Sequence, residues 1–321
     1  TDGSAADAPR PRRVEVAGVR SLAEFVMRGR WQAVGTISAL GILGWLLPPV
    51  SYLSGAAAGL CALRHGAREG FLVVSYAAFG AGLVTLVGIG NVLPAMFLAI
   101  AWWLPIWLCA QVLRIGRSQG LALAAIGGLA VLAVVAARVL VDDVEGWWRG
   151  VLEHIVSAAP GHEDMGPERA MLDALAVMMN SLVAGAFAMS VMIALLIARY
   201  WQGLLYNPGG FRAEFEGLRL PGALVPAVVL TGVFATIEAL VFGQRHGLVI
   251  DLLVVAVAMY GFQGLAIAHH YVRNRQLASA WLVALYMVVL VVPQIALVAL
   301  AALGLLDHRV NFRHLPVGDK A

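Results

Sequence analysis

The stretch LALAAIGGLAVLAVVAARVLV, residues 121–141, contains a single charged side chain, Arg138, and no proline. At about 1.5 Å per residue, a helix of this length is about 31 Å long, which matches the hydrocarbon core of a bilayer. Only a helix or a closed barrel satisfies its backbone hydrogen bonds in lipid, and strict two-residue alternation is missing here. We therefore predict a membrane-spanning helix.

Comparable apolar segments recur along the chain, and its composition agrees with them. Of the 321 residues, 61% are hydrophobic and only 13% are charged, whereas soluble domains have roughly 25% charged residues. We predict an all-α polytopic transmembrane bundle, with further spans at roughly 70–89, 92–113, 171–204, 223–242, 248–270 and 280–306.

The first apolar run, residues 31–63, is interrupted by Pro48-Pro49. Each half has about 15–17 residues, which is short for a full span. Arg28 and Arg30 precede the run and Arg64 follows it, so both ends favour the same side of the membrane. This pattern predicts a Pro-broken hairpin of two short helices or a re-entrant pair, and about eight or nine membrane segments in all.

The arginines predict the orientation. With a cytoplasmic N-terminus, most of them fall inside and the acidic segment 142–170 falls outside, as the positive-inside rule requires. The expected localisation is a bacterial inner membrane. One feature disagrees: if 280–306 crosses once, the basic C-terminal tail lies outside.

The chain divides by polarity into four parts. We expect a disordered N-terminal tail at 1–15, an amphipathic interfacial helix at 16–30, a transmembrane domain at 31–306 and a C-terminal tail at 307–321. The transmembrane domain contains an external loop at 142–170, with its own interfacial helix, and a cytoplasmic loop at 206–220.

The cytoplasmic loop is the most distinctive polar feature. It begins with Asn-Pro-Gly-Gly at 207–210, a strong turn sequence, and continues with apolar residues at helical spacing. One interpretation is a tight turn followed by an interfacial helix that seats the next span. The other is a docking surface for a cytoplasmic partner, formed by Asn207, Phe211, Arg212, Phe215, Glu216 and Arg219.

Several polar residues lie within apolar runs, where an unpaired group in hydrocarbon costs free energy. We take four as speculative ligand-binding residues: Asn180, Gln263, His270 and Gln294. The alternative for the amides is a hydrogen bond between helices, and for the histidine a place at the membrane interface. Four ionisable groups lie nearer the predicted outer ends, where they can pair or reach water: Arg138, Asp173, Glu238 and Asp251.

The remaining sequence features mainly exclude classes of function. Gly55 and Gly59 form a GxxxG pattern, which serves either internal helix packing or a groove for a partner. Cys61 and Cys109 lack a CxxC partner, so we expect buried reduced thiols, no metal and no cofactor. Neither a nucleophile elbow nor a phosphate-binding loop is present, and the arginines form no continuous patch for nucleic acid. We therefore do not expect an enzyme or a nucleic-acid-binding protein.

The loop string ARYWQGLLYNPGGFRAEFEGLRL, residues 198–220, resembles the proteobacterial branch of the YybS-like family of uncharacterised multi-spanning membrane proteins. Similar pieces are LAEFVMRGR at 22–30, FQGLA at 262–266 with His269, and GLLD at 304–307 running into Phe312-Arg313. The resemblance implies an inner-membrane protein with a domain of unknown function. It also implies a distant fold-level similarity to substrate-binding components of energy-coupling-factor transporters and to MreD-type proteins, which have fewer spans or other roles.

Two functional hypotheses follow. The leading one is a non-enzymatic transporter-like component that lies in the lipid bilayer, binds a small hydrophobic or amphipathic ligand and works with a protein partner. The alternative is a membrane scaffold that recruits cytoplasmic or cell-envelope machinery through the 206–220 loop.

Overall fold

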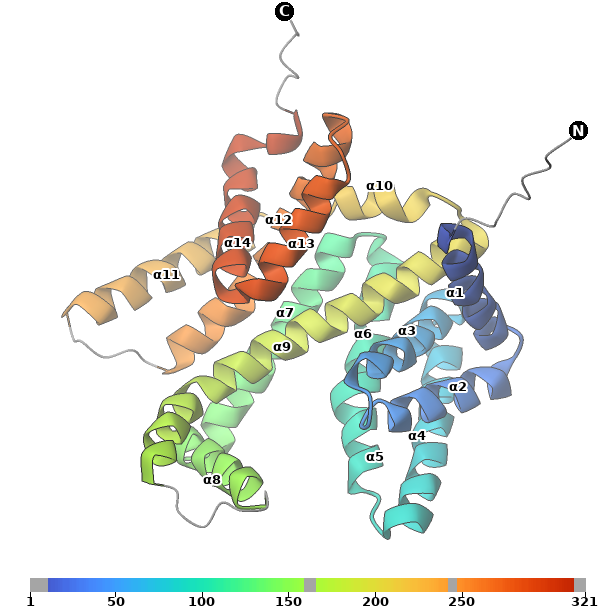
Figure 1. Ribbon diagram of the computed structural model, residues 1–321, viewed down its shortest axis with the longest axis horizontal. Coiled ribbons are helices and arrows are strands. Elements are labelled where there is room, and N and C mark those ends of the chain that lie inside the picture. The colour runs from blue at the N-terminus through green and yellow to red at the C-terminus, as the bar shows by residue number, and fades with distance from the viewer. Residues whose placement is uncertain (1–10, 159–165, 242–246, 315–321) are drawn as a thin grey trace, which may run out of the picture. The chain divides into compact units, whose positions relative to one another are not determined.

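The computed structural model describes residues 11–158, 166–241 and 247–314, and every regular element among them is a helix. The all-α prediction is confirmed. In chain order (Figure 1) the elements are α1 Pro11–Met27, α2 Arg30–Leu43, α3 Pro48–His65, α4 Ala67–Ile89, α5 Leu93–Phe97, η1 Leu98–Trp103, α6 Leu104–Gly116, α7 Gln119–Leu140, α8 Val144–Ser157, α9 Gly166–Tyr206, α10 Gly210–Glu216, α11 Leu224–Val241, α12 Gly247–Asn274, α13 Ala280–Val291, α14 Pro293–Val310 and η2 Phe312–His314.

Seven stretches of the described chain are long and apolar enough to cross a membrane: α4, the continuous α5–η1–α6 segment, α7, α9 from Arg169, α11, α12 and α14. Helices α11 and α13 expose almost all of their side chains, with Glu238 the one buried residue of the two. Such apolar surfaces fit contact with lipid. The total of eight or nine membrane segments stays a prediction.

Helices α1 and α14 extend into the segments that we predicted as tails. Of the N-terminal tail at 1–15, residues 1–10 lie outside the described chain and the rest belong to α1. The external loop contains α8, at the place where a short helix was expected, and its residues 159–165 also lie outside the description. The C-terminal tail begins within α14, and residues 315–321 are not described.

Contacts divide the chain into two compact units, which are described separately. Unit 1 comprises residues up to Arg117 together with 193–213, and unit 2 comprises 118–192 together with the chain from Glu214 onward. Helix α9 contributes to both units. Its 41 residues make it about 60 Å long, about twice the thickness of the hydrocarbon core.

The first hairpin of unit 1 is present, with the chain reversing at 44–47 directly before Pro48. The Ser54 hydroxyl donates to the Ile37 carbonyl across the hairpin, at 2.7 Å. Every residue of α3 from Ser54 to Leu63 is buried. Gly55 and Gly59 pack against alanine side chains of α9, Ala194 and Ala198. The GxxxG pattern therefore serves packing within the chain.

A widened turn, the π-helix η1, lies directly before Pro105. Proline has no N–H to bond one turn back, and π-turns are a common way to accommodate such a break. The turn places two neighbouring indoles toward α3. The Trp103 indole N–H donates to the Ser54 hydroxyl at 2.9 Å, and the Trp102 indole N–H donates to the Ser51 carbonyl at 3.1 Å.

Unit 2 is built on close contacts of α7, the first part of α9, and α12. Gly120, at the start of α7, touches the backbone of Arg219, because a Cβ there would lie 1.8 Å from the Arg219 carbonyl oxygen. At the other end of α7, Arg138 pairs with Asp251 near the start of α12. Helices α7 and α12 are therefore antiparallel, and Arg219 lies at the end of the unit where α12 finishes.

The last two helices form a second Pro-broken hairpin. We predicted one kinked span over 280–306, and this prediction is wrong: the chain reverses at Val292-Pro293, and Figure 1 shows α13 and α14 side by side. Helix α14 starts beside the middle of α12, where Gly261 contacts Leu297. It then runs parallel to α12, and Arg313 donates to the Leu218 carbonyl.

The chain can reverse because Pro293 interrupts the backbone hydrogen bonds of the helix. Glycines of α12 and α14 then allow the two helix backbones to pack closely. A Cβ on Gly264 would lie 1.9 Å from the Leu300 carbonyl oxygen, and one on Gly304 would lie 2.3 Å from the Tyr260 carbonyl oxygen. The C-terminal end of α14 consequently lies at the same end of unit 2 as the C-terminal end of α12.

Candidate functional site

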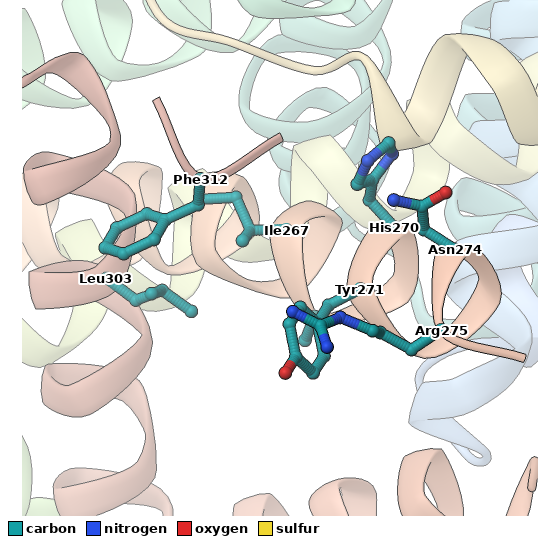
Figure 2. Close-up of a pocket in the computed structure, with 8 residues that line it drawn as sticks. Ile267, His270, Tyr271, Asn274, Arg275, Leu303 and Phe312 are labelled. Atoms are coloured by element: carbon teal, nitrogen blue, oxygen red, sulfur yellow. The ribbon is translucent and has the colours of Figure 1, made fainter. Parts of the chain in front are cut away.

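A pocket of 330 Å³ lies between the last turns of α12 and the C-terminal part of α14 with η2. Figure 2 shows Phe312 and Leu303 on one side and the stacked Tyr271 and Arg275 on the other. The complete lining is Ile267, Ala268, His270, Tyr271, Asn274, Arg275, Leu303 and Phe312.

The lining changes character along α12. Ile267 is buried and faces the apolar side chains of Leu303 and Phe312, whereas Asn274 and Arg275 lie two turns later at the exposed end of the helix. The walls thus change from apolar to polar over about 10 Å. A pocket with such walls suits a molecule that has one apolar and one polar end.

Arg273 and Arg275 lie at the end of α12, but only Arg275 lines the pocket. Arg273 forms an ion pair with the buried Glu216 carboxylate. Arg275 lies over the Tyr271 ring, with 5.2 Å between its guanidinium carbon and the ring centroid. No carboxylate in the described part of the chain pairs with Arg275. Within the described residues, the polar end of the pocket therefore carries a positive charge without an acidic partner.

His270 connects the pocket to the Glu216 pair. Its Nδ1 lies 4.0 Å from a Glu216 carboxylate oxygen, while its Nε2 is buried and has no hydrogen-bond partner. A buried polar atom without a partner costs free energy unless a ligand or water satisfies it. The imidazole thus offers a bonding position at the wall of the pocket.

A second polar cluster, around Asp307, ties α12, α14 and the 218–220 segment together. The Gln263 side chain is fully buried, accepts from the Leu220 N–H and donates to the Gly304 carbonyl, both at 2.9 Å. Asp307, also fully buried, accepts from the Phe312 N–H at 3.0 Å. Because its hydrogen bonds are used within the protein, Gln263 holds the hairpin in place.

Two guanidinium groups balance the Asp307 carboxylate: Arg219 at 3.8 Å and Arg313 at 3.5 Å. Burial lowers the pKa of Arg313; the Asp307 carboxylate opposes this shift and Arg219 adds to it. Arginine stays protonated despite such a shift, because its ordinary pKa is above 12. The cluster therefore has one negative and two positive charges.

The third cluster lies at the opposite end of α12. Asp251, 1% exposed, receives two hydrogen bonds from Arg138 at 3.0 and 3.1 Å and one from the Asn180 amide at 2.6 Å. All three reach one carboxylate oxygen, and the other is buried without a partner. Gly247 makes room for the pair, because a Cβ there would meet the Arg138 guanidinium.

The structure separates the four residues that we predicted to bind a ligand. Asn180 belongs to the Asp251 cluster and Gln263 to the Asp307 cluster, while His270 lines the pocket. Gln294 is exposed at the turn between α13 and α14. Sequence reasoning missed Tyr271, Asn274, Arg275 and Phe312, whose one shared signal is their position where an apolar run ends.

Most of the predicted docking residues have contacts within the protein. Phe211 packs on Tyr200 within unit 1, and Phe215 packs on His269 within unit 2. Glu216 and Arg219 are held by the ion pairs described above. Asn207, Arg212 and Arg219 are exposed. Because Arg219 is held by its ion pair with Asp307, Asn207 and Arg212 are the exposed docking candidates outside the ion pairs described above.

Comparison with known proteins places the chain in a family. A model of predicted membrane proteins (DUF2232) matches residues 36–308. The chain belongs to this family. Neither the curated proteins nor the solved structures include a match. For this DUF2232 member, the described residues contain no group of three His, Cys, Asp or Glu side chains that could hold a metal ion.

Proposed function

We propose that this DUF2232 protein is a non-enzymatic, multi-pass component of a bacterial inner membrane that binds a small amphipathic molecule and works with a protein partner. The observation that carries the proposal is the α12–α14 pocket, whose walls change from apolar to polar over two helical turns. The sequence resembles the YybS-like family, whose distant fold-level similarity to energy-coupling-factor components supplies the analogy with transport.

The two broken hairpins support the same proposal. Helices α2 and α3 reverse before Pro48 in unit 1, and α13 and α14 reverse before Pro293 in unit 2. Short Pro-interrupted helices in both halves of a membrane protein often accompany substrate sites. In this protein the second hairpin forms one wall of the pocket.

The charges of unit 2 support a cytoplasmic location for the pocket. Arg275 lines its polar end and Arg273 lies beside it on α12, and the C-terminal end of α14 with η2 adds Arg309 and Arg313 to the same end of the unit. Cytoplasmic ends of membrane helices are rich in arginine. Independently, the arginines from Arg10 to Arg30 in the sequence favour a cytoplasmic N-terminus.

Native mass spectrometry of protein extracted gently from its own membrane tests the proposal. Ala268→Phe fills the pocket, and Ala239→Phe is the matched control, because Ala239 is exposed on α11. We expect one small molecule per chain on the wild type and on the control, and none on Ala268→Phe. Three empty proteins, or equal retention by all three, would contradict the proposal.

The scaffold hypothesis has one specific observation in its favour, the exposure of Asn207 and Arg212 in the loop. Under this hypothesis Arg212→Ala abolishes the retention of a co-purifying protein, while any small molecule stays bound. Under the leading proposal Arg212→Ala leaves the small molecule in place and Ala268→Phe removes it. The two variants, measured in the same native spectra, therefore distinguish the hypotheses.

A further inference from the structure

We infer that the amphipathic molecule in the α12–α14 pocket is an anionic phospholipid, with its phosphate group at Arg275 and part of one acyl chain against Ile267, Leu303 and Phe312. This inference rests on the proposed function, because it names the ligand of the same pocket. It is argued from the charge, the size and the accessibility of the site.

Arg275 is the arginine of the pocket lining, and no carboxylate of the described residues pairs with it. Glu216 is the acidic group beside the pocket, and Arg273 pairs with it directly. Arg275 retains its full positive charge and is held at the pocket by the Tyr271 ring. A guanidinium is well suited to phosphate, since its N–H groups can bind two oxygens at once.

Hydrogen-bonding groups lie next to this charge. The buried His270 Nε2 has no partner in the protein, and the Asn274 amide lines the same end of the pocket. A phospholipid headgroup supplies phosphate and hydroxyl or ester oxygens at this depth. A headgroup at the polar end can therefore place its phosphate at Arg275 and accept a hydrogen bond from the Asn274 amide.

The size favours a lipid over a soluble amphiphile that must be enclosed completely. At 330 Å³, the pocket lies near the lower limit of ligand sites, which enclose most of a small ligand in about 300–1,000 Å³. A lipid needs less enclosure, because the rest of its chains stays in the bilayer. Tyr271 is 50% exposed, so a lipid can enter from the side.

The test is a titration of delipidated protein in detergent micelles with phosphatidylglycerol or with phosphatidylcholine of the same acyl chains, counted by native mass spectrometry. Both lipids carry a phosphate, but the quaternary ammonium of phosphatidylcholine cancels its net charge, so one arginine at the headgroup should favour the anionic lipid by about fivefold. We expect this preference in the wild type, its loss in Arg275→Gln and its retention in Arg309→Gln, whose arginine is exposed outside the pocket. Ala268→Phe and, independently, Leu303→Trp should abolish the binding of both lipids.

Each other outcome has a defined meaning. Equal binding of the two lipids, lost in the pocket-filling variants, overturns the anionic ligand and leaves the proposed function standing. Displacement of phosphatidylglycerol by soluble glycerol phosphate overturns the lipid and indicates a soluble phosphate compound. Unchanged binding in both pocket-filling variants overturns the inference and the proposed function together.

Discussion

The Arg138–Asp251 pair allows a quantitative test of the packing of unit 2. Asp251 is 1% exposed and Arg138 is 23% exposed, and Asn180 adds a hydrogen bond to the same carboxylate oxygen. Removing one member of a buried pair costs about 3–5 kcal/mol, because the other charge stays buried without a partner. Replacing both by apolar residues costs much less, since no charge remains.

We therefore expect Asp251→Leu to destabilise unit 2 by about 3 kcal/mol, the lower end of the range, since Arg138 can reach solvent. Arg138→Met should lower the free energy of unfolding by more, because the unpaired Asp251 carboxylate is almost completely buried. The double variant should recover most of the loss, to within about 1 kcal/mol of the wild type. The free energy of unfolding is measured by titration with sodium dodecyl sulfate in mixed micelles, followed by tryptophan fluorescence.

The matched control is the Arg149–Asp173 pair in the same unit, whose side chains are 43% and 55% exposed. The corresponding single substitutions there should cost less than about 1 kcal/mol. If the double variant at Arg138 and Asp251 loses as much as the two single variants together, the two charges are not energetically coupled. The interpretation of this cluster as a buried ion pair would then be refuted.

Three further predictions concern packing, topology and the thiols. Gly264→Ala should destabilise the protein by more than about 2 kcal/mol, since its methyl group would overlap the backbone of α14. The control, Gly128→Ala, places its methyl group in open space and should be neutral or slightly stabilising in the same unfolding titration. A reporter enzyme fused to the C-terminus should be active on the cytoplasmic side, because α14 ends beside the arginine-bearing end of α12; activity on the outer side would mean that the C-terminal segment crosses the membrane. Cys61 and Cys109 are each 1% exposed, so a maleimide should label them only after unfolding, and rapid labelling of the folded protein would contradict their burial.

The helical class and the long apolar helices were predictable because they depend on local composition. A run such as residues 121–141 is long and apolar whatever surrounds it, and the structure has α7 there. The break before Pro48 was predictable for the same reason, since two short halves with arginines at both ends cannot cross as one span.

The second reversal was not predictable from the local sequence. A proline after Val292 is compatible with a kink or with a complete turn, and the choice depends on distant contacts, such as Gly264 against the Leu300 backbone. The pocket depends on the same reversal, because it brings Leu303 and Phe312 beside the end of α12. His270 alone among the predicted ligand residues lines it, since the polar groups deeper in the helices turned out to bind one another.

The Asp307 cluster was missed for a related reason. Its aspartate stands at the edge of an apolar run, where an exposed charge is the ordinary expectation. Burial became evident only when the structure brought Gln263, Arg219 and Arg313 around it.

The reversal at Pro293 has a consequence for how the chain is inserted into the membrane. A final segment that crossed completely would have to carry Asp307, Arg309 and Arg313 through hydrocarbon at the end of synthesis, and the middle of the bilayer opposes each such charge by about 2.5–3.5 kcal/mol. A hairpin whose two ends lie together spares the insertion machinery this transfer. With the cytoplasmic orientation proposed above, folding of the C-terminal region requires only that an uncharged turn enters the lipid, while the charged residues remain on the side where the ribosome released them.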